Sequence, residues 1–180
     1  MEKGGTKKEE MILRPITEED TADIIRWRNS DHVRRNFLYQ ELFTEEVHLH
    51  WLHTMVETGK VRQFIMILRS EDRLKERPVG SVYLRDIDTE KGTAEYGIFI
   101  GEKDTLGRGY GTQACRMMRS YAKNVLKLKK LFLRLFEDNE AARKSYESAG
   151  FSVIPGRREK VFSVMEQREK NVIFMETELI

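Results

Sequence analysis

The chain has 180 residues, of which 39% are hydrophobic, so it is long enough to bury a core and fits one domain. Its 32 basic and 30 acidic residues give a net charge of +2, which does not indicate a nucleic-acid partner. No apolar stretch approaches the roughly 18 residues that span a bilayer, and residues 1–10 are charged. We predict a cytoplasmic protein without a membrane partner, with a flexible leader, 1–10, and a single domain, 11–180.

The first predicted elements are a strand over residues 11–16 and a helix directly after it. Thr17 is followed by three acidic residues, a pattern typical of a helix N-terminus because the hydroxyl caps backbone N–H groups and the helix dipole favours negative charge. We expect this helix to carry Ile24, Ile25 and Trp27 inward.

A second helix is predicted to begin at Thr44. Val47, Trp51 and Met55 recur every four residues after it, with Leu52 and Val56 beside them, and this stripe indicates the core or the wall of a cleft. Three potential metal ligands on the same segment have spacings that could bring them to one helical face, but nothing completes a coordination set, and no metal is predicted. These residues are Glu46, His50 and His53.

Three apolar segments separated by polar turns predict consecutive antiparallel strands. They cover residues 63–69, 79–85 and 93–100. The following segment opens with glycines and continues with helical periodicity. The single cysteine, Cys115, falls among apolar residues of this helix and is interpreted as a packing residue. The residues expected on the buried face are Ala114, Met118, Tyr121 and Val125.

A short apolar strand, 131–136, follows that helix and predicts a parallel crossover to the preceding strand. Asn139 can cap a further helix, 140–149, and Gly150 can end it. The sum is an α+β domain with a central mixed, mostly antiparallel sheet flanked by helices. Strands near the C-terminus favour a homodimer; the last three predicted strands are 151–154, 161–165 and 172–179.

The glycines at the start of the central helix are the clearest chemical motif. Gly107, Gly109 and Gly111 follow a strand and precede a helix N-terminus, where outward N–H groups and the helix dipole bind anions, and Arg108 can add a charge. We infer a pyrophosphate site, against the alternative of a turn without ligand. The segment lacks the Lys-Ser/Thr pair of a P-loop and comes too late for a dinucleotide fingerprint.

Two motifs together resemble the GNAT family of N-acetyltransferases. The first is "LGRGYG", residues 106–111, which is similar to the family's coenzyme A signature Arg/Gln-x-x-Gly-x-Gly/Ala, although Leu106 stands where Arg or Gln is usual. The second is "NEAARKSYESAGF", residues 139–151. The resemblance extends from Met11 onward and is greatest to ribosomal-protein N-terminal, spermidine and amino-sugar-nucleotide acetyltransferases. It implies the GNAT fold and acetyl-CoA as co-substrate.

The resemblance also implies where the co-substrate binds. The strand before the glycines is expected to align its backbone with the pantetheine arm, and a main-chain N–H near Ile98 to polarise the thioester carbonyl. Gly97 suits a bulge or a close approach within that strand. The expected coenzyme A contacts are Ile98, Ile100, Leu106, Gly107, Arg108, Gly109, Gly111, Thr112 and Asn139.

Acetyl transfer to an amine needs a neutral nucleophile, a stabilised oxyanion and a proton for the departing thiolate. Glu95 is the candidate base, with an ordinary surface glutamate as the alternative. Tyr146 matches the family's tyrosine that protonates the thiolate, with a helix-packing aromatic as the alternative.

In this fold the acceptor cleft is walled by the N-terminal helices. The segments "WRN", "HVRRNF" and "HLHW" look like those of members that acetylate a nucleotide-linked amino sugar, whose phosphates would suit arginines. A polyamine and a protein N-terminus stay open as acceptors, and so does a catalytically inert acetyl-CoA-binding module. The expected acceptor-binding residues are Trp27, Arg28, Asn29 and Trp51.

Overall fold

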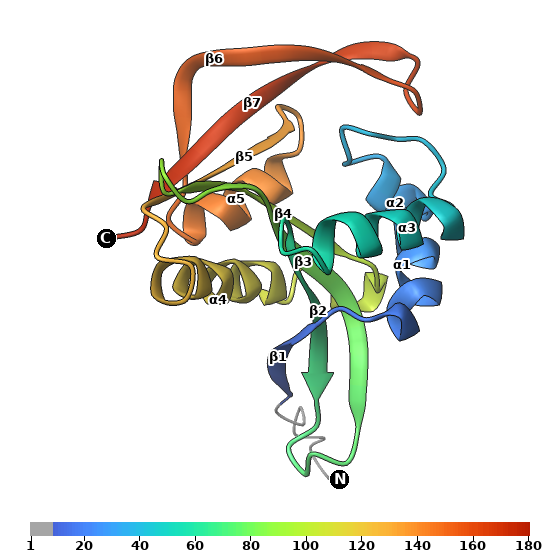
Figure 1. Cartoon of the computed structure of the whole chain (residues 1–180). Coiled ribbons are helices and arrows are strands. Elements are labelled where there is room, and N and C mark those ends of the chain that lie inside the picture. The colour runs from blue at the N-terminus through green and yellow to red at the C-terminus, as the bar shows by residue number, and fades with distance from the viewer. Residues whose placement is uncertain (1–8) are drawn as a thin grey trace, which may run out of the picture.

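The computed structural model describes residues 9–180 (Figure 1). The predicted leader lies mostly outside these residues, and the first strand already includes Glu10. In residues 9–180 there is no helix long and apolar enough to cross a membrane. The helices are α1 (Thr21–Arg28), α2 (Asp31–Arg34), α3 (Glu45–Trp51), α4 (Tyr110–Asn124) and α5 (Glu140–Ser148), with short helical turns η1 (Glu18–Asp20), η2 (Leu52–Val56) and η3 (Lys103–Thr105).

Seven strands form one sheet in the order β1-β2-β3-β4-β5-β7-β6. All neighbours are antiparallel except β4 and β5, which are parallel and are connected through α4. The predicted mixed sheet with one parallel crossover is therefore confirmed. The strands are β1 (Glu10–Pro15), β2 (Arg62–Arg69), β3 (Glu76–Asp88), β4 (Thr93–Ile100), β5 (Lys130–Phe136), β6 (Ser152–Ser163) and β7 (Arg168–Glu178).

The parallel pair at the centre of the sheet is short. β4 pairs with β5 only from Thr93 to Glu95, opposite Lys130 to Phe132. Beyond Glu95 the strand has β3 as its neighbour on one side and no strand paired on the other. In residues 9–180, the backbone N–H and C=O groups on that side of residues 96–99 have no strand partner and are available to an extended ligand, whereas the C=O of Ile100 lies 3.1 Å from His32 Nε2.

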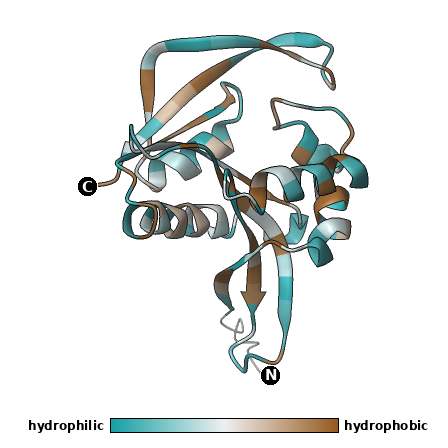
Figure 2. Ribbon diagram, viewed as in Figure 1, coloured by the Kyte–Doolittle hydropathy of each residue, from teal (hydrophilic) through white to brown (hydrophobic). Residues whose placement is uncertain are grey.

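Two apolar cores lie on opposite faces of the sheet. The larger one joins the strands to α4 and α5, and Met118 and Leu131 are fully buried in it. The smaller one joins the other face to α1, α2 and η2, around Trp27 and Phe99. Figure 1 shows α4 and α5 grouped apart from the three N-terminal helices, and Figure 2 shows the hydrophobic residues along β1 and β2.

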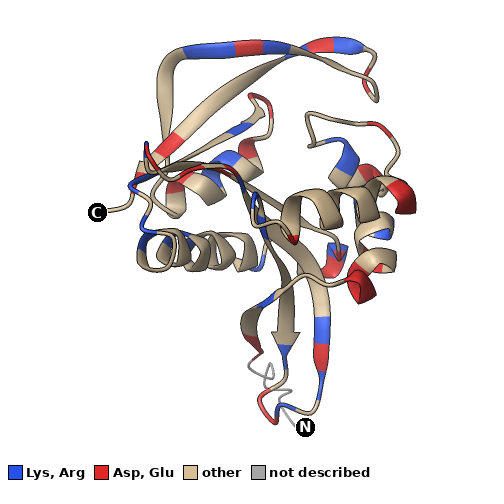
Figure 3. Cartoon of the chain, viewed as in Figure 1, with Lys and Arg blue, Asp and Glu red and all other residues tan. Residues whose placement is uncertain are grey.

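The C-terminal hairpin differs from the prediction. Residues 152–163 form one long strand instead of two short ones, and its pairing with β7 is irregular between Val153 and Arg158. Pro155 and Gly156 break the alternation of the sequence there without ending the extended chain. Basic and acidic residues alternate along the hairpin (Figure 3), as is usual for a strand at the edge of a sheet. A homodimer stays a prediction.

The prediction for α3 is right about its start and partly right about its inner face. The hydroxyl of Thr44 accepts a hydrogen bond from the Val47 backbone N–H and caps the helix. Leu52 is buried as predicted, but Val47 is exposed, and His48 is buried in its place and packs edge-on against Phe43. A similar error occurs at the end of α4, where Val125 is exposed.

Candidate active site

One cavity of about 760 Å³ connects the two regions in which the sequence predicts binding residues, the glycine segment and the N-terminal helices. Its lining includes the glycine segment and the start of α5 on one side and residues of α1, α2 and α3 on the other. Strands β3, β4 and β5 form its floor. A ligand that enters along the glycines therefore meets a ligand that enters along the N-terminal helices.

The glycine segment has the geometry of an anion cradle. Gly107 and Gly109 have φ of +72° and +83°, in the left-handed region that favours glycine. A Cβ built on either one would have no heavy atom within 4 Å, so open space lies beside the backbone. Gly109 is the N-cap of the 15-residue helix α4, whose first N–H groups have no partners within the helix. These features fit the phosphates of a nucleotide such as coenzyme A.

Other predicted coenzyme A contacts are distributed around this segment. The side chains of Ile98 and Ile100 end within 4.0 Å of the position that a Cβ on Gly111 would take. Asn139 caps α5 by accepting a hydrogen bond from the Ala142 backbone N–H at 3.2 Å. Residues that line the cavity are Ile98, Ile100, Leu106, Gly107, Gly109, Gly111, Thr112 and Asn139.

Arg108 is the predicted coenzyme A contact that does not line the cavity. The residue is exposed, and its guanidinium carbon lies 5.9 Å from the centroid of the Tyr110 ring. Thr112 instead joins two helices, because its hydroxyl lies 3.0 Å from the hydroxyl of Ser145 on α5.

Tyr146 projects from α5 and lines the same cavity. Its ring packs with Tyr96 and Phe151, with centroids 6.1 Å apart in each pair. Burial raises the pKa of the Tyr146 hydroxyl above its ordinary value. The phenol is therefore protonated at neutral pH and can act as a proton donor, so the packing role and the catalytic role are compatible.

Glu95 is not an ordinary surface residue, because its carboxylate is buried in the cavity floor. Arg85 on β3 donates to Oε2 at 3.0 Å, and Arg134 on β5 donates to Oε1 at 3.0 Å. Both carboxylate oxygens are thus engaged by guanidinium groups. Gly97, two residues on, allows a close approach as predicted, since a Cβ there would lie 2.2 Å from the ring of Tyr83.

Two of the four predicted acceptor-binding residues belong to the framework of the helices. Trp27 is only 1% exposed and donates from its indole nitrogen to Glu102 at 2.8 Å. The side-chain amide of Asn29 bonds both the N–H and the C=O of Phe43, which fixes the connection before α3. Neither lines the cavity, and a short motif in sequence could not separate framework from cavity wall.

Arg28 and Trp51 do line the cavity. The indole nitrogen of Trp51 donates to Gln63 on the cavity floor at 2.9 Å. The guanidinium of Arg28 stacks on the rings of Phe37 and Phe43, and its Nη1 is buried without a hydrogen-bond partner. Desolvation by burial lowers the pKa of Arg28 to about 10.

The lining is rich in unsatisfied polar groups. Six buried side-chain N or O atoms in residues 9–180 have no hydrogen-bond partner, and four of them belong to residues that line the cavity. Buried polar groups are normally paired, so this concentration indicates a polar ligand. The four atoms are Arg28 Nη1, His32 Nδ1, His48 Nε2 and Tyr96 OH.

The sequence prediction missed the cavity residues Arg85 and Arg134, and it included His32 only as part of the acceptor segment "HVRRNF". The sequence did contain a signal for Arg85. It follows Tyr83 by two residues in β3, and the two side chains therefore lie on the same face of the sheet. No comparable signal marked Arg134, because its neighbourhood depends on the pairing of β5 with β4.

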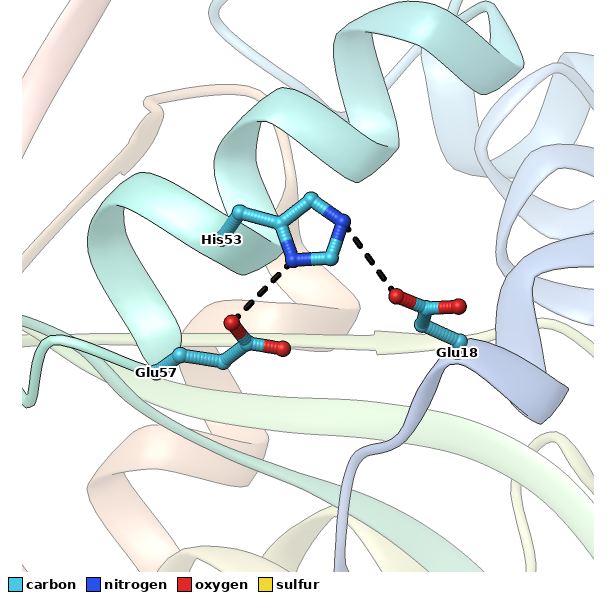
Figure 4. A group of neighbouring side chains, drawn as sticks. All are labelled: Glu18, His53 and Glu57. Carbon is cyan, nitrogen blue, oxygen red and sulfur yellow. Dashed lines mark hydrogen bonds and ion pairs between the residues drawn. The ribbon is translucent and has the colours of Figure 1, made fainter.

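The three potential ligands Glu46, His50 and His53 do not form a metal-binding group in the described part of the chain. His53 lies instead between two other carboxylates, with Nε2 at 3.2 Å from Glu18 and Nδ1 at 3.1 Å from Glu57 (Figure 4). The three side chains are exposed and outside the cavity. The two carboxylates approach different ring nitrogens. A reaction without metal stays a prediction.

Comparison with known proteins gives the site a family. The model of the acetyltransferase (GNAT) domain matches residues 10–152. Spermidine N(1)-acetyltransferase of Escherichia coli is 30% identical over 143 residues, which cover 78% of this chain and 72% of that protein. An uncharacterised protein of Methanocaldococcus jannaschii is 31% identical over 150 residues, or 83% of this chain, and the chain spans only 29% of its length. The alpha/beta-tubulin-N-acetyltransferase 9 of Drosophila melanogaster is 26% identical over 160 residues, which cover 84% of this chain and 79% of that protein.

Solved structures support the same fold. Spermidine N-acetyltransferase from Vibrio cholerae, solved with CoA and spermine, superposes with a TM-score of 0.82 over 94% of this chain and 95% of that one, at 20% identity. A domain from Methanocaldococcus jannaschii superposes with a TM-score of 0.78 over 95% of this chain and 99% of that one, at 26% identity.

Proposed function

Because the chain belongs to the acetyltransferase (GNAT) domain family and is an N-acetyltransferase, we propose that it acetylates a small-molecule primary amine that carries negative charge. The acceptor class is the one predicted from the sequence, a nucleotide-linked amino sugar. The observation that carries this proposal is the charge of the cavity. In residues 9–180 it is lined by three arginines, Arg28, Arg85 and Arg134, and by a single carboxylate, Glu95.

The two histidines of the lining, His32 and His48, add no negative charge to the cavity. Burial lowers the pKa of His48, which is therefore neutral at pH 7. Phosphate groups accept paired hydrogen bonds from guanidinium groups and would compensate the excess positive charge. A polyamine would instead bring further positive charge into a cavity that already has an excess of it.

The residues on the opposite side of the cavity suit acetyl-CoA, which supplies an activated acetyl group as a thioester. We assign its phosphates to the N–H groups around Gly107, Gly109 and Gly111. The free edge of β4 after Glu95 supplies N–H and C=O groups for the pantetheine amides, including the N–H near Ile98. Tyr146, protonated because it is buried, is assigned as the donor to the leaving sulfur.

A base role for Glu95 stays a prediction, and its contacts favour a role in holding Arg85 and Arg134 in place. Each oxygen of its carboxylate already accepts a hydrogen bond from a guanidinium group. Taking a proton from an acceptor ammonium would neutralise the carboxylate and weaken these charge-assisted bonds.

A polyamine acceptor is the second candidate, and the relatives favour it. The Escherichia coli relative is a spermidine acetyltransferase, and the Vibrio cholerae enzyme of the same fold was solved with spermine. The named relatives thus support the polyamine more directly than the amino sugar, whereas the charges of this cavity support an anionic acceptor. The Drosophila relative keeps a protein acceptor as a third alternative.

The test is coenzyme A release from acetyl-CoA by the purified protein, with separate reactions containing a UDP-linked 4-amino sugar, spermidine or an N-terminal peptide. We expect turnover with the sugar nucleotide to exceed turnover with the other two acceptors. Faster turnover with spermidine or peptide would refute the proposed acceptor class. Acetyl-CoA binding without release in any reaction would instead support the inert module.

A further inference from the structure

Arg85, Glu95 and Arg134 form a cluster on the cavity floor where β4 separates from β5. Arg85 and Glu95 are directly opposite in the β3–β4 pair, and Glu95 is the last residue of β4 that pairs with β5. Arg134 lies two residues beyond Phe132, the last paired residue of β5. The sheet therefore delivers the three side chains from three adjacent strands to the point at which the central gap opens.

The charges of this cluster do not cancel. One carboxylate faces two guanidinium groups, and the three side chains are only 9%, 22% and 19% exposed for Glu95, Arg85 and Arg134. Two further carboxylates lie at ion-pair distance, Glu159 at 3.8 Å from Arg134 Nη1 and Asp86 at 3.7 Å from Arg85 Nε, but they are 49% and 68% exposed. Solvent weakens the contribution of both, so a net positive charge remains in a partly desolvated position.

Hydrogen-bonding capacity also remains. Arg85 uses Nε and Nη2 for Glu95, and within residues 9–180 its Nη1 has no hydrogen-bond partner. Arg134 likewise uses Nε and Nη2 for Glu95. A guanidinium presents five N–H donors in a fixed plane, so both groups retain donors beyond those that Glu95 occupies.

The cluster continues into the helical wall of the cavity. The buried hydroxyl of Tyr83 lies within electrostatic range of Arg28 as well as of Arg85 and Arg134. Two sources of positive charge, one on the floor and one on the wall, thus flank the same phenol. An ion-pair network that only stabilised the sheet would need one arginine for one glutamate, because an uncompensated buried charge costs stability.

We propose that Arg85 and Arg134 form a binding subsite for an anionic group of the acceptor, such as the diphosphate of a sugar nucleotide, and that Glu95 positions the two guanidinium groups. This inference rests on the proposed function and adds residues to it. Glu95 holds the arginines apart and fixes their planes, and it does not contact the reacting amine.

The first experiment measures UDP binding by calorimetry to protein saturated with coenzyme A, so that UDP cannot occupy the coenzyme site. We expect Arg134→Met and Arg85→Met each to weaken UDP binding about 10- to 100-fold, as expected for loss of a charge-assisted contact. Arg143→Met is the matched control, since Arg143 is exposed, pairs with Glu147 and does not line the cavity. Its UDP affinity should equal that of the unmodified protein.

A second variant protects the test against misfolding. If thermal denaturation shows that Arg134→Met is unfolded, Arg134→Lys keeps the charge but loses the paired donors, and it should still weaken UDP binding about tenfold. Unchanged UDP affinity in Arg85→Met and in a folded Arg134 variant would overturn the subsite.

The role of Glu95 is read from the pH profile of the Glu95→Gln variant. A positioning residue predicts a higher KM for the acceptor with an unchanged shape of the kcat profile against pH. Loss of the acidic limb of that profile would show a base and overturn the positioning role.

The outcomes separate the subsite from the proposed function. If replacement of Arg85 and of Arg134 leaves UDP affinity unchanged while the protein still acetylates the sugar nucleotide, the subsite is refuted and the proposed function is not. Absence of UDP binding together with acetylation of spermidine refutes the proposed acceptor class and the subsite with it.

Discussion

The guanidinium carbon of Arg28 lies 3.5 Å from the centroid of the Phe37 ring, in the wall of the cavity. Stacking satisfies the face of the guanidinium, but its Nη1 is buried without a partner. The protein thus maintains a desolvated cation beside this cavity. Such an arrangement is costly in the free protein and is compensated when an anion binds.

Replacement of Arg28 by Met should separate stability from function. We expect the free energy of unfolding to rise by about 1 kcal/mol, because an apolar side chain of similar length replaces a buried unpaired charge. The KM for an anionic acceptor should rise about 10- to 100-fold, with acetyl-CoA affinity unchanged. Denaturant titration and steady-state kinetics measure the two effects. An unchanged KM would remove Arg28 from acceptor binding.

The glycine cradle is tested by Gly109→Val. We expect acetyl-CoA affinity to fall at least about tenfold, since a side chain would enter the space assigned to phosphate and strain a backbone with φ of +83°. Gly156→Val is the matched control: its φ is +73°, it also has no neighbour within 4 Å, and it lies on β6 away from the cavity. If calorimetry shows the same loss of acetyl-CoA affinity in both variants, backbone strain explains the effect and the phosphate site does not.

Tyr146→Phe should lower kcat about 100-fold and leave acetyl-CoA binding unchanged, because the variant keeps the ring packing and loses only the proton donor. Single-turnover kinetics isolates this chemical step. Tyr121→Phe, on α4 and packed against Phe64, is the control that should retain full activity. A Tyr146→Phe enzyme with full turnover would mean that the residue only packs.

The thiol of Cys115 should be inert in the folded protein. It is fully buried, and burial raises its pKa to about 12. A disulfide-exchange reagent at pH 8 should therefore release no chromophore from native protein and one equivalent after denaturation with guanidinium chloride. Rapid reaction of native protein would contradict its interpretation as a packing residue.

His48 should make the protein less stable in acid. Burial depresses its pKa in the folded state below the value of about 6.5 expected in the unfolded chain. The unfolded state therefore binds the proton first, and stability falls as pH drops below about 6.5. We expect the His48→Gln variant to lose less stability than the unmodified protein between pH 7 and pH 5. Parallel urea titrations that show identical losses would refute this.

The fold was accessible from sequence because its signals are local. The glycine turn, the Thr44 cap and the apolar segment from Thr93 to Ile100 each depend on a few neighbouring residues, and the structure contains the turn, the cap and the predicted strand. The burial of His48 in place of Val47 was not accessible, because it depends on contact with Phe43 from outside the helix.

The site was only partly accessible for the same reason. Sequence motifs identified the glycine segment at the start of α4 and Tyr146 on α5, the next helix along the chain. Trp27 and Arg28 are adjacent in sequence, yet the first is core and the second lines the cavity. Arg134 reaches Glu95 only through strand pairing across 39 residues, and no local pattern encodes that contact.

The central claim, that this cavity selects an anionic amine, is tested most directly by competition in one reaction. The protein is incubated with acetyl-CoA and equal concentrations of a UDP-linked 4-amino sugar and spermidine, and the products are identified by mass spectrometry. We predict a singly acetylated sugar nucleotide and unmodified spermidine. Acetylated spermidine with an unmodified sugar nucleotide would contradict the account.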